Sequence, residues 1–478
     1  MSQPQPPSGG ARRRSAPRRS RVNATTLLAV VLPVLSVLAL LLVRPEQPTD
    51  DVRPPTSSTL TSATLLCPSA LSGAPDVSLT TVAEGVDAQV KVGLGAKAAD
   101  VPLRTGQVTS HEDDDALAVT GEDEAAPGLV ASRSGGSEQA VESCRPPAAD
   151  QWFTGLGAGA NRSSVLELTN PDAGTAIADV TVQGRDGVDD SAAAQRLRGV
   201  SVPGGGSIRF NLAEVVPRTD DLALHVVATR GRIGASVLDR NDRVGSSPLT
   251  QDWLPAQDEP RTSNVLLGLA PGKGTRNLVI ANPGDDEVRA DLKVVGARSV
   301  FAPEGVDEIR VAPGSVVRVP VSAAVDAAVA DDAVGVLLTS SGPVTATLRS
   351  NVDGDLSHAV AGVPFSGEAA VLLPEAPKSG AQKSERRVVL GAASSAGTAT
   401  VTALAEDGSR LRRTEVELVP GRAACVSVPR ESRQLRVKVE RTSVTGAVVT
   451  SAKGGTSVVP LTVPVMNGQV PDVRPGLS

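Results

Sequence analysis

The chain contains three histidines, His111, His225 and His358, the residues best suited to acid–base chemistry near neutral pH. None lies at metal-ligand spacing from another histidine or a cysteine, and the nucleophile motif Gly-x-Ser-x-Gly is absent. A Ser-His-Asp triad built from distant residues stays open, because its members need not be neighbours in sequence. We therefore assign no catalytic, cofactor-binding or metal-binding residue and predict a non-enzymatic protein. A hydrolase with a buried polar site that includes His225 or His358 is the least favoured alternative.

Four short motifs suggest ligand binding but do not fit it. Residues 268–275 (GLAPGKGT) have the wrong spacing for a phosphate loop and predict a hairpin turn. The glycines within 155–159 are not followed by a helical pattern, and predict a loop rather than a dinucleotide site. Residues 351–355 lack the terminal Glu of a calcium loop and predict a turn between strands. The acidic run 112–115 predicts a solvated loop.

Composition limits the elements that could hold any site. Aromatic residues make up 1% of the chain and Tyr is absent, so the core must be built from Val, Leu, Ala and Ile. Val and Ile favour strands. The chain contains 46 Gly and 36 Pro at short intervals, as expected for many short strands joined by turns. The net charge is −6, which disfavours a nucleic-acid partner.

After the N-terminal region, the sequence repeats with a period of about 110 residues, which is close to the typical length of one domain. LELTNP at 166–171 corresponds to LVIANP at 278–283. The strand pair at 224–241 corresponds to the pair at 334–351 and more loosely to residues 435–451. These matches predict tandem copies of one unit.

Alternation of apolar and charged residues defines the strands. Residues 288–294 and 435–440 each alternate with period two, which indicates half-buried antiparallel strands. We predict an all-β fold of tandem immunoglobulin-like β-sandwich units after one N-terminal transmembrane helix. The predicted segments are a basic cytoplasmic tail (1–22), a transmembrane helix (23–43), a Pro-rich linker (44–60), a divergent β unit (61–149), three sandwich units (150–255, 256–365 and 366–467) and a flexible tail (468–478).

The membrane prediction depends on the 20 uncharged residues from Ala24 to Val43. At 1.5 Å per residue such a helix spans about 30 Å, the thickness of the hydrocarbon core. Six arginines precede it, so the N-terminus is expected in the cytoplasm and the bulk of the chain outside the cell. A cleaved signal peptide is the alternative, although the apolar run is long and no A-x-A site follows.

The chain has three cysteines. Cys67 and Cys144 bracket the N-terminal β unit, and we predict that they form a disulfide in an oxidising exterior. Cys425 lies in an apolar strand and is predicted to be a buried free thiol.

Large aromatic side chains lie near the predicted unit junctions. Trp152, Phe153 and Trp253 are either packing elements between units or anchors for a partner. Carbohydrate recognition usually needs more aromatic faces than this chain offers.

Three runs of sequence resemble a known family: TLLCPS at 64–69, CRPPAADQWFTG at 144–155, and LELTNP. The chain is similar over most of residues 60–465 to an uncharacterised actinobacterial family of secreted or membrane-anchored proteins, classed as a domain of unknown function. The resemblance implies no activity and no site residue.

The leading hypothesis for function is a membrane-anchored cell-envelope protein with a structural or protein-interaction role. Its partners would be the membrane itself and an envelope protein such as a membrane glycosyltransferase. A binding module for cell-wall polymer is the alternative. The oligomeric state is left open.

Overall fold

The computed structural model describes residues 56–72, 74–135, 140–241, 249–329, 332–375, 384–452 and 455–470. Residues 57–469 form one compact unit, and the rest of the chain forms a second, which is described at few positions. The predicted tail 1–22 and transmembrane segment 23–43 lie outside the described residues. Within the described residues, no helix is both long enough and apolar enough to cross a bilayer.

The described fold is all-β, as the alternation predicts. In β21 (Val288–Gly296), Val288, Ala290 and Leu292 are buried while the charged residues between them are exposed. The helices are few and short: α2 (Leu212–Val215), α3 (Ser322–Val329), and the 3-10 turns η1 (Gly95–Lys97), η2 (Asp123–Ala125) and η3 (Ala194–Leu197).

The strands form four pairs of antiparallel sheets, and the first pair lies in the N-terminal region. One sheet has the order β2-β7-β4-β5 and the other β6-β3-β8-β9. The strands are β2 (Ser62–Cys67), β3 (Asp76–Thr81), β4 (Asp87–Val92), β5 (Ala99–Arg104), β6 (Thr109–Glu112), β7 (Leu117–Glu122), β8 (Leu129–Gly135) and β9 (Ala140–Ser143).

The second pair repeats this order, as β10-β16-β12-β13 and β15-β11-β17-β18, with β14 also on β12. Its strands are β10 (Asp150–Ala158), β11 (Arg162–Asn170), β12 (Ala176–Gly184), β13 (Gly187–Val188), β14 (Val200–Val202), β15 (Gly206–Asn211), β16 (Thr219–Arg230), β17 (Gly234–Asn241) and β18 (Thr250–Leu254). The N-terminal unit therefore has the same topology as the unit that follows it.

The third pair has the same order, but one long strand serves both sheets. The first part of β25 pairs with β19 and β21, and its second part pairs with β20 and β26. The strands are β19 (Arg261–Leu267), β20 (Gly274–Ala281), β21, β22 (Val300–Phe301), β23 (Ile309–Val311), β24 (Val316–Pro320), β25 (Ala333–Val352) and β26 (Asp355–Val360).

In the fourth pair, the long strand β32 serves both sheets, as β25 does in the third pair. The strands are β27 (Phe365–Leu372), β28 (Glu385–Gly391), β29 (Gly397–Leu404), β30 (Arg410–Leu418), β31 (Ala424–Val428), β32 (Gln434–Ala452) and β33 (Gly455–Pro460). Two further strands, β1 (Thr56–Thr59) and β34 (Asn467–Val470), pair with each other.

Each pair of sheets packs face to face in the manner of a β-sandwich. In the second pair, Phe153 and Val180 from one sheet share a core with Leu166 and Val237 from the other. Burial of this aliphatic face is the main stabilising term, since each fully buried side chain contributes about 1.5–3 kcal/mol. We number the four sandwiches in chain order, so that this second pair is the second sandwich.

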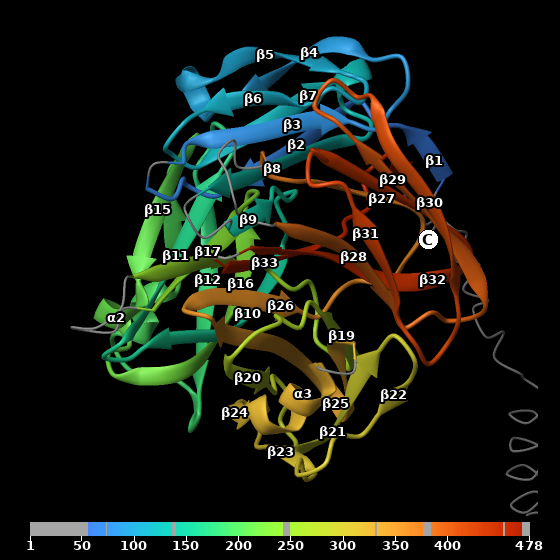
Figure 1. Ribbon diagram of the computed structural model, residues 1–478. Coiled ribbons are helices and arrows are strands. Elements are labelled where there is room, and N and C mark those ends of the chain that lie inside the picture. The colour runs from blue at the N-terminus through green and yellow to red at the C-terminus, as the bar shows by residue number, and fades with distance from the viewer. Residues whose placement is uncertain are drawn as a thin grey trace, which may run out of the picture. The chain divides into compact units, whose positions relative to one another are not determined.

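The last strand of each sandwich contacts the last strands of two others. The order of contact is β9 with β18, β18 with β26, β26 with β33, and β33 with β9. Figure 1 labels β9, β33 and β26 of this circuit near the centre of the view. The fourth sandwich therefore contacts the first, and the four edge strands close a circuit.

Equivalent asparagines make the same hydrogen bonds in the second and third sandwiches. The side chain of Asn170 donates to the carbonyls of Gly174 and Val202, and Asn282 donates in the same way to three carbonyls that follow its own strand. The Oδ1 of each accepts the backbone N–H two residues on. The LELTNP and LVIANP motifs thus fix the same turn in two sandwiches.

Candidate functional site

The three histidines lie in three different environments. His111 is part of β6, at the edge of the first sandwich. His225 stacks on Trp152 with 3.8 Å between ring centroids, and its Nε2 lies 2.9 Å from the Asp150 carboxylate. His358 is buried on β26 and belongs to a network of buried polar side chains.

Strand register brings that network together around Asp239. On β17, Asp239 pairs with Ser164 of β11 on one side and with Asp252 of β18 on the other. In the third sandwich, Arg349 of β25 pairs with His358 of β26. Residues paired across neighbouring strands share a face of the sheet. The polar residues of the second and third sandwiches therefore meet where the sheet that contains β17 contacts the sheet that contains β26.

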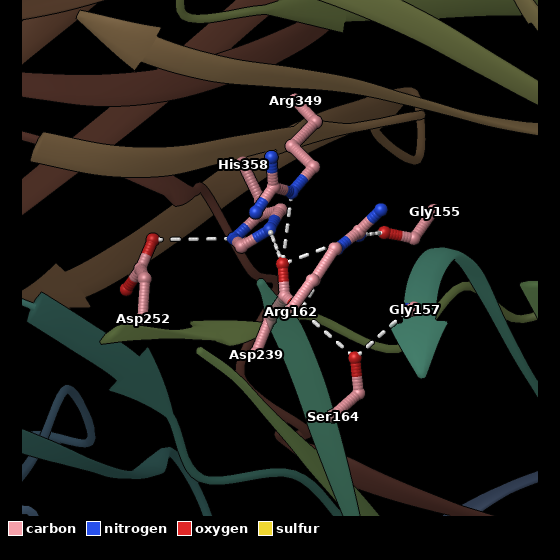
Figure 2. A network of polar contacts seen from close by, with 8 residues as sticks. All are labelled: Gly155, Gly157, Arg162, Ser164, Asp239, Asp252, Arg349 and His358. Atoms are coloured by element: carbon pink, nitrogen blue, oxygen red, sulfur yellow. Dashed lines mark hydrogen bonds and ion pairs between the residues drawn. The ribbon is translucent and has the colours of Figure 1, made fainter. Parts of the chain in front are cut away.

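The Asp239 carboxylate accepts hydrogen bonds from both sandwiches (Figure 2). Within its own sandwich, Ser164 Oγ donates to Oδ1 at 2.8 Å, and the Arg162 guanidinium lies 3.3 Å from both oxygens. From the third sandwich, Arg349 Nε and His358 Nε2 lie 2.9 and 3.2 Å from Oδ2. The other ring nitrogen of His358 lies 3.4 Å from Asp252.

The charges in this network are mutually dependent because all of them are buried. Burial opposes ionisation of Asp239, but Arg162, Arg349 and His358 hold its pKa well below the usual range. Burial likewise disfavours the imidazolium of His358, and the two carboxylates raise its pKa. Burial raises the pKa of Asp252 despite its contact with His358. The network is best described as an ion cluster with Asp239 at its centre.

This cluster meets the expectation of a buried polar site that includes His358, but its geometry is not that of a serine hydrolase. A hydrolase triad needs the serine hydroxyl against a histidine nitrogen. Here the Ser164 hydroxyl donates to Asp239 and accepts from the backbone N–H of Gly157. Both nitrogens of His358 face carboxylates, which favours the charged ring rather than a free base.

Side-chain hydrogen bonds also link the other sandwiches in contact. Ser69 of the first sandwich donates from its backbone N–H and its hydroxyl to Glu167 of the second, at 2.9 and 2.6 Å. The backbone N–H of Thr456 in the fourth donates to Asp355 of the third at 2.8 Å. Arg433 Nη2 of the fourth lies 3.2 Å from Ser78 Oγ of the first. Every step of the circuit thus carries a specific polar link besides apolar packing.

A cavity of about 580 Å³ lies where the segments that follow the four last strands converge. Its wall includes residues 143–147, 255–258, 360–363 and 460–465, one segment from each sandwich. Alanine, valine, leucine and proline dominate these segments. Three valines on the wall are also exposed, Val363 at 46%, Val463 at 52% and Val465 at 51%. We call these three residues the apolar rim.

Glu142 of β9 is the unusual residue of this wall. Its side chain is 8% exposed, and it forms no hydrogen bond or ion pair with the rest of the described chain. Burial raises its pKa to about 8, with Asp252 acting in the same direction against Arg145 and His358. Glu142 is therefore a neutral hydrogen-bond donor at pH 7, facing an apolar cavity.

The structure confirms the predicted disulfide and corrects the prediction for the third cysteine, Cys425. Cys67 and Cys144 are bonded and close a segment with a sequence separation of 77. Cys425, predicted to be buried, is exposed. The reason is the alternation of β31: Val426 and Val428 fill the core, so Cys425 must point away from it.

The aromatic residues singled out in the sequence are all buried. Trp152 is 6% exposed, Phe153 0% and Trp253 2%. Trp253 packs with Leu71 and Ala140 of the first sandwich. Trp152 exchanges two backbone hydrogen bonds with Gln257, beyond the end of its own sandwich. These positions agree with packing between units.

Two loop predictions from the glycine motifs are wrong and one is right. Residues 268–273 connect β19 and β20, which pair with different parts of β25 and not with each other, so they do not form a hairpin. Gly155 and Gly157 lie within β10, where register shifts accommodate them. Asp353 and Gly354 form the tight turn between β25 and β26, with φ of 51° and 86°. Among the described residues, no His, Cys, Asp and Glu side chains gather as a metal site would require.

Sequence reasoning missed the Asp239 cluster and Glu142. Asp239 and His358 are 119 positions apart, and no local motif joins the members of the cluster. The one available signal is a charged residue within a strand pattern, such as Asp239 in SVLDRN at 236–241 and Arg349 in VTATLRSN at 344–351.

The fold and the site define a tandem β-sandwich protein whose sandwiches are joined by polar contacts, with an apolar cavity lined by segments of all four. Residues 105–429 match the family described as a family of unknown function (DUF5719). This match covers more than half of the chain, and the chain belongs to that family. No curated protein matches it.

Proposed function

We propose that the protein is a non-enzymatic, membrane-anchored cell-envelope protein that acts as a rigid scaffold for protein interaction. The observation that supports this most is the closed circuit of last strands, in which each contact has a buried polar link. Such links oppose bending between sandwiches and keep distant surfaces at a constant spacing. The immunoglobulin-like architecture suits the same role, because sandwiches of this kind often present surfaces at the cell exterior.

The proposed topology places the N-terminus in the cytoplasm and the sandwiches outside. The uncharged segment from Ala24 to Val43 and the arginines before it support this orientation. The Cys67–Cys144 disulfide is further support, since such bonds persist in oxidising compartments.

The apolar rim is the proposed contact surface for a partner. Exposed valines close together are unusual on a soluble monomer and mark interaction sites. Val463 and Val465 directly precede β34, which pairs with β1, the first described strand after the proposed anchor. This connection favours a partner that is itself in the membrane, such as an envelope glycosyltransferase.

Site-specific photo-crosslinking in native membranes tests this function. A photoreactive residue at Val463 or Val363 is expected to capture one envelope protein reproducibly. The control positions are Val188 and Leu411, exposed at 42% and 41% on other surfaces. Equal capture at rim and control positions would contradict the scaffold proposal.

A further inference from the structure

The cavity beside the apolar rim has the properties of a small-molecule site. Ligand sites are commonly concave, about 300–1,000 Å³ in volume, mostly apolar and equipped with a few polar groups. The cavity meets each condition: its volume is about 580 Å³, its wall is aliphatic, and Glu142 supplies a buried polar group.

Glu142 is the feature that points to a ligand. Its side chain is 8% exposed, it has no hydrogen-bond partner in the described chain, and its carboxyl oxygens are not among the fully enclosed polar atoms, so a molecule in the cavity can reach them. Every other charged side chain on the wall has a partner, since Arg145 pairs with Asp258 and Arg232 pairs with Asp172. Among the described residues of the wall, Glu142 alone is left to bind something in the cavity.

We propose that the cavity binds one uncharged, single-chain lipid, whose polar end accepts a hydrogen bond from the carboxyl group of Glu142. This site goes beyond the proposed scaffold function, because it assigns a ligand and not a protein partner.

The volume argues for one chain. A water molecule occupies about 30 Å³ in the liquid, so the cavity holds about 20 groups of that size. One alkyl or isoprenoid chain of ordinary length has about as many methylene-sized groups. A two-chain lipid does not fit.

Charge argues for an uncharged polar end. An anionic headgroup would compete with Asp258 and Asp172 for Arg145 and Arg232, while a cationic headgroup would have to displace those arginines. An ester, ether or hydroxyl oxygen needs no counter-ion and satisfies the Glu142 donor. The exposed rim gives the chain an apolar route into the cavity.

The test uses the full-length protein, delipidated, transferred to an amphipathic polymer and titrated with 1-monopalmitoylglycerol under native mass spectrometry. We expect one molecule bound per chain. Palmitate and hexadecyltrimethylammonium, with the same chain length and opposite charges, are expected to bind at least about tenfold more weakly.

Variants assign the binding to the cavity. Glu142→Ala should weaken binding about fivefold, as expected for one lost hydrogen bond, and Glu142→Gln, which keeps a neutral donor, should stay within about twofold. Ala361→Phe and Ser62→Phe place a ring at the wall and should weaken binding about tenfold. Glu415→Ala and Ala173→Phe are the matched controls, on exposed positions that do not line the cavity.

The proposal is overturned if 1-monopalmitoylglycerol does not bind or if the three lipid probes bind with equal affinity. It is also overturned if Ala361→Phe and Ser62→Phe both bind 1-monopalmitoylglycerol as tightly as the wild type does. Ser62 is exposed, so its substitution keeps the test valid even if Ala361→Phe fails to fold. Lipid binding and rim crosslinking are separate readouts, and either can fail without the other.

Discussion

At the scale of single residues, Asp239 joins the second and third sandwiches through contacts with Arg349 and His358. Its carboxylate is completely buried and is shared by two arginines and one histidine. A buried ion pair adds little over a well-packed apolar pair, but removal of one partner leaves the others uncompensated. The cluster thus makes the contact between the second and third sandwiches selective for one arrangement.

Replacement of Asp239 by Ala is expected to lower the free energy of unfolding by about 3–5 kcal/mol, because two guanidiniums and an imidazolium lose their counter-ion. Denaturant titration measures the change. The control is Asp291→Ala on the exposed face of β21, where a change within about 0.5 kcal/mol is expected. Equal losses in the two variants would show that the cluster contributes nothing specific.

The pH dependence of stability follows from the two shifted groups. Asp239 has a depressed pKa, so its contribution is present above about pH 4, the unfolded value, and is lost as the pH falls through its folded pKa. His358 has a raised pKa, so its contribution is complete below about pH 6.5 and is lost as the pH rises through its folded pKa.

The stability advantage of the wild type over His358→Asn should therefore be greatest between about pH 4 and 6.5 and shrink above that range. Denaturant titrations at a series of pH values measure it, with His111→Asn as the control outside the cluster. A difference that does not vary with pH would contradict an imidazolium at position 358.

At the scale of elements, the repeated unit is a set of strands with a fixed order, modified in each copy. The turn that follows β11 in the second sandwich, β20 in the third and β28 in the fourth shows the variation. Asn170 and Asn282 fix it in the second and third sandwiches, whereas the equivalent residue of the fourth is Ala392, which has a positive φ of 53°. The left-handed conformation is unfavourable for Ala by about 1–2 kcal/mol and is tolerated by Asn.

Position 392 has a left-handed conformation that Asn170 and Asn282 lack. Ala392→Asn is expected to raise the free energy of unfolding by about 1 kcal/mol, because Asn tolerates this conformation better than Ala. Thermal or denaturant unfolding measures it. Ala393→Asn, at the next position, lacks the positive φ and should destabilise. A loss of stability in Ala392→Asn would contradict the expectation that the left-handed conformation of Ala392 is unfavourable.

The strands were predictable because their information is local. Alternation in residues 288–294 follows from the pleat of a half-buried strand, and the NP motifs carry the turn that follows them. The sequence did not predict that the first sandwich has the same topology as the others, because its strands have the same order but carry no shared sequence motif. The site depends on pairs such as Asp239 with Arg349, whose contact is set by the packing of sandwiches and leaves no local pattern.

At the scale of the whole compact unit, residues 57–469, the circuit of last strands couples the stability of the four sandwiches. The fourth sandwich contacts the first through Arg433 and Ser78, and through Arg436, which donates to the carbonyls of Thr81 and Val82. A sandwich joined on two sides unfolds at the cost of both contacts, so the unit is expected to unfold cooperatively.

Calorimetry of the full-length protein should therefore show a single transition for the sandwiches. The double variant Arg433→Ala, Arg436→Ala should split it, because it removes the polar links that close the circuit. The matched control is Arg412→Ala, Arg413→Ala on the exposed face of β30. Two transitions in the wild type would contradict the coupling.

The contact between the first and last sandwiches also governs the order in which the chain can mature. Ser78 and Arg433 are 355 positions apart, and Val82, Val108 and Val130 pack on Ala370 and Leu372. While the chain is being synthesised from its N-terminus, that valine surface has nothing to cover it until nearly the whole polypeptide has emerged. A prematurely terminated product would present it permanently and aggregate rather than act as a smaller version of the protein. Biogenesis therefore demands either swift completion of the chain or a chaperone that shields the first sandwich in the meantime.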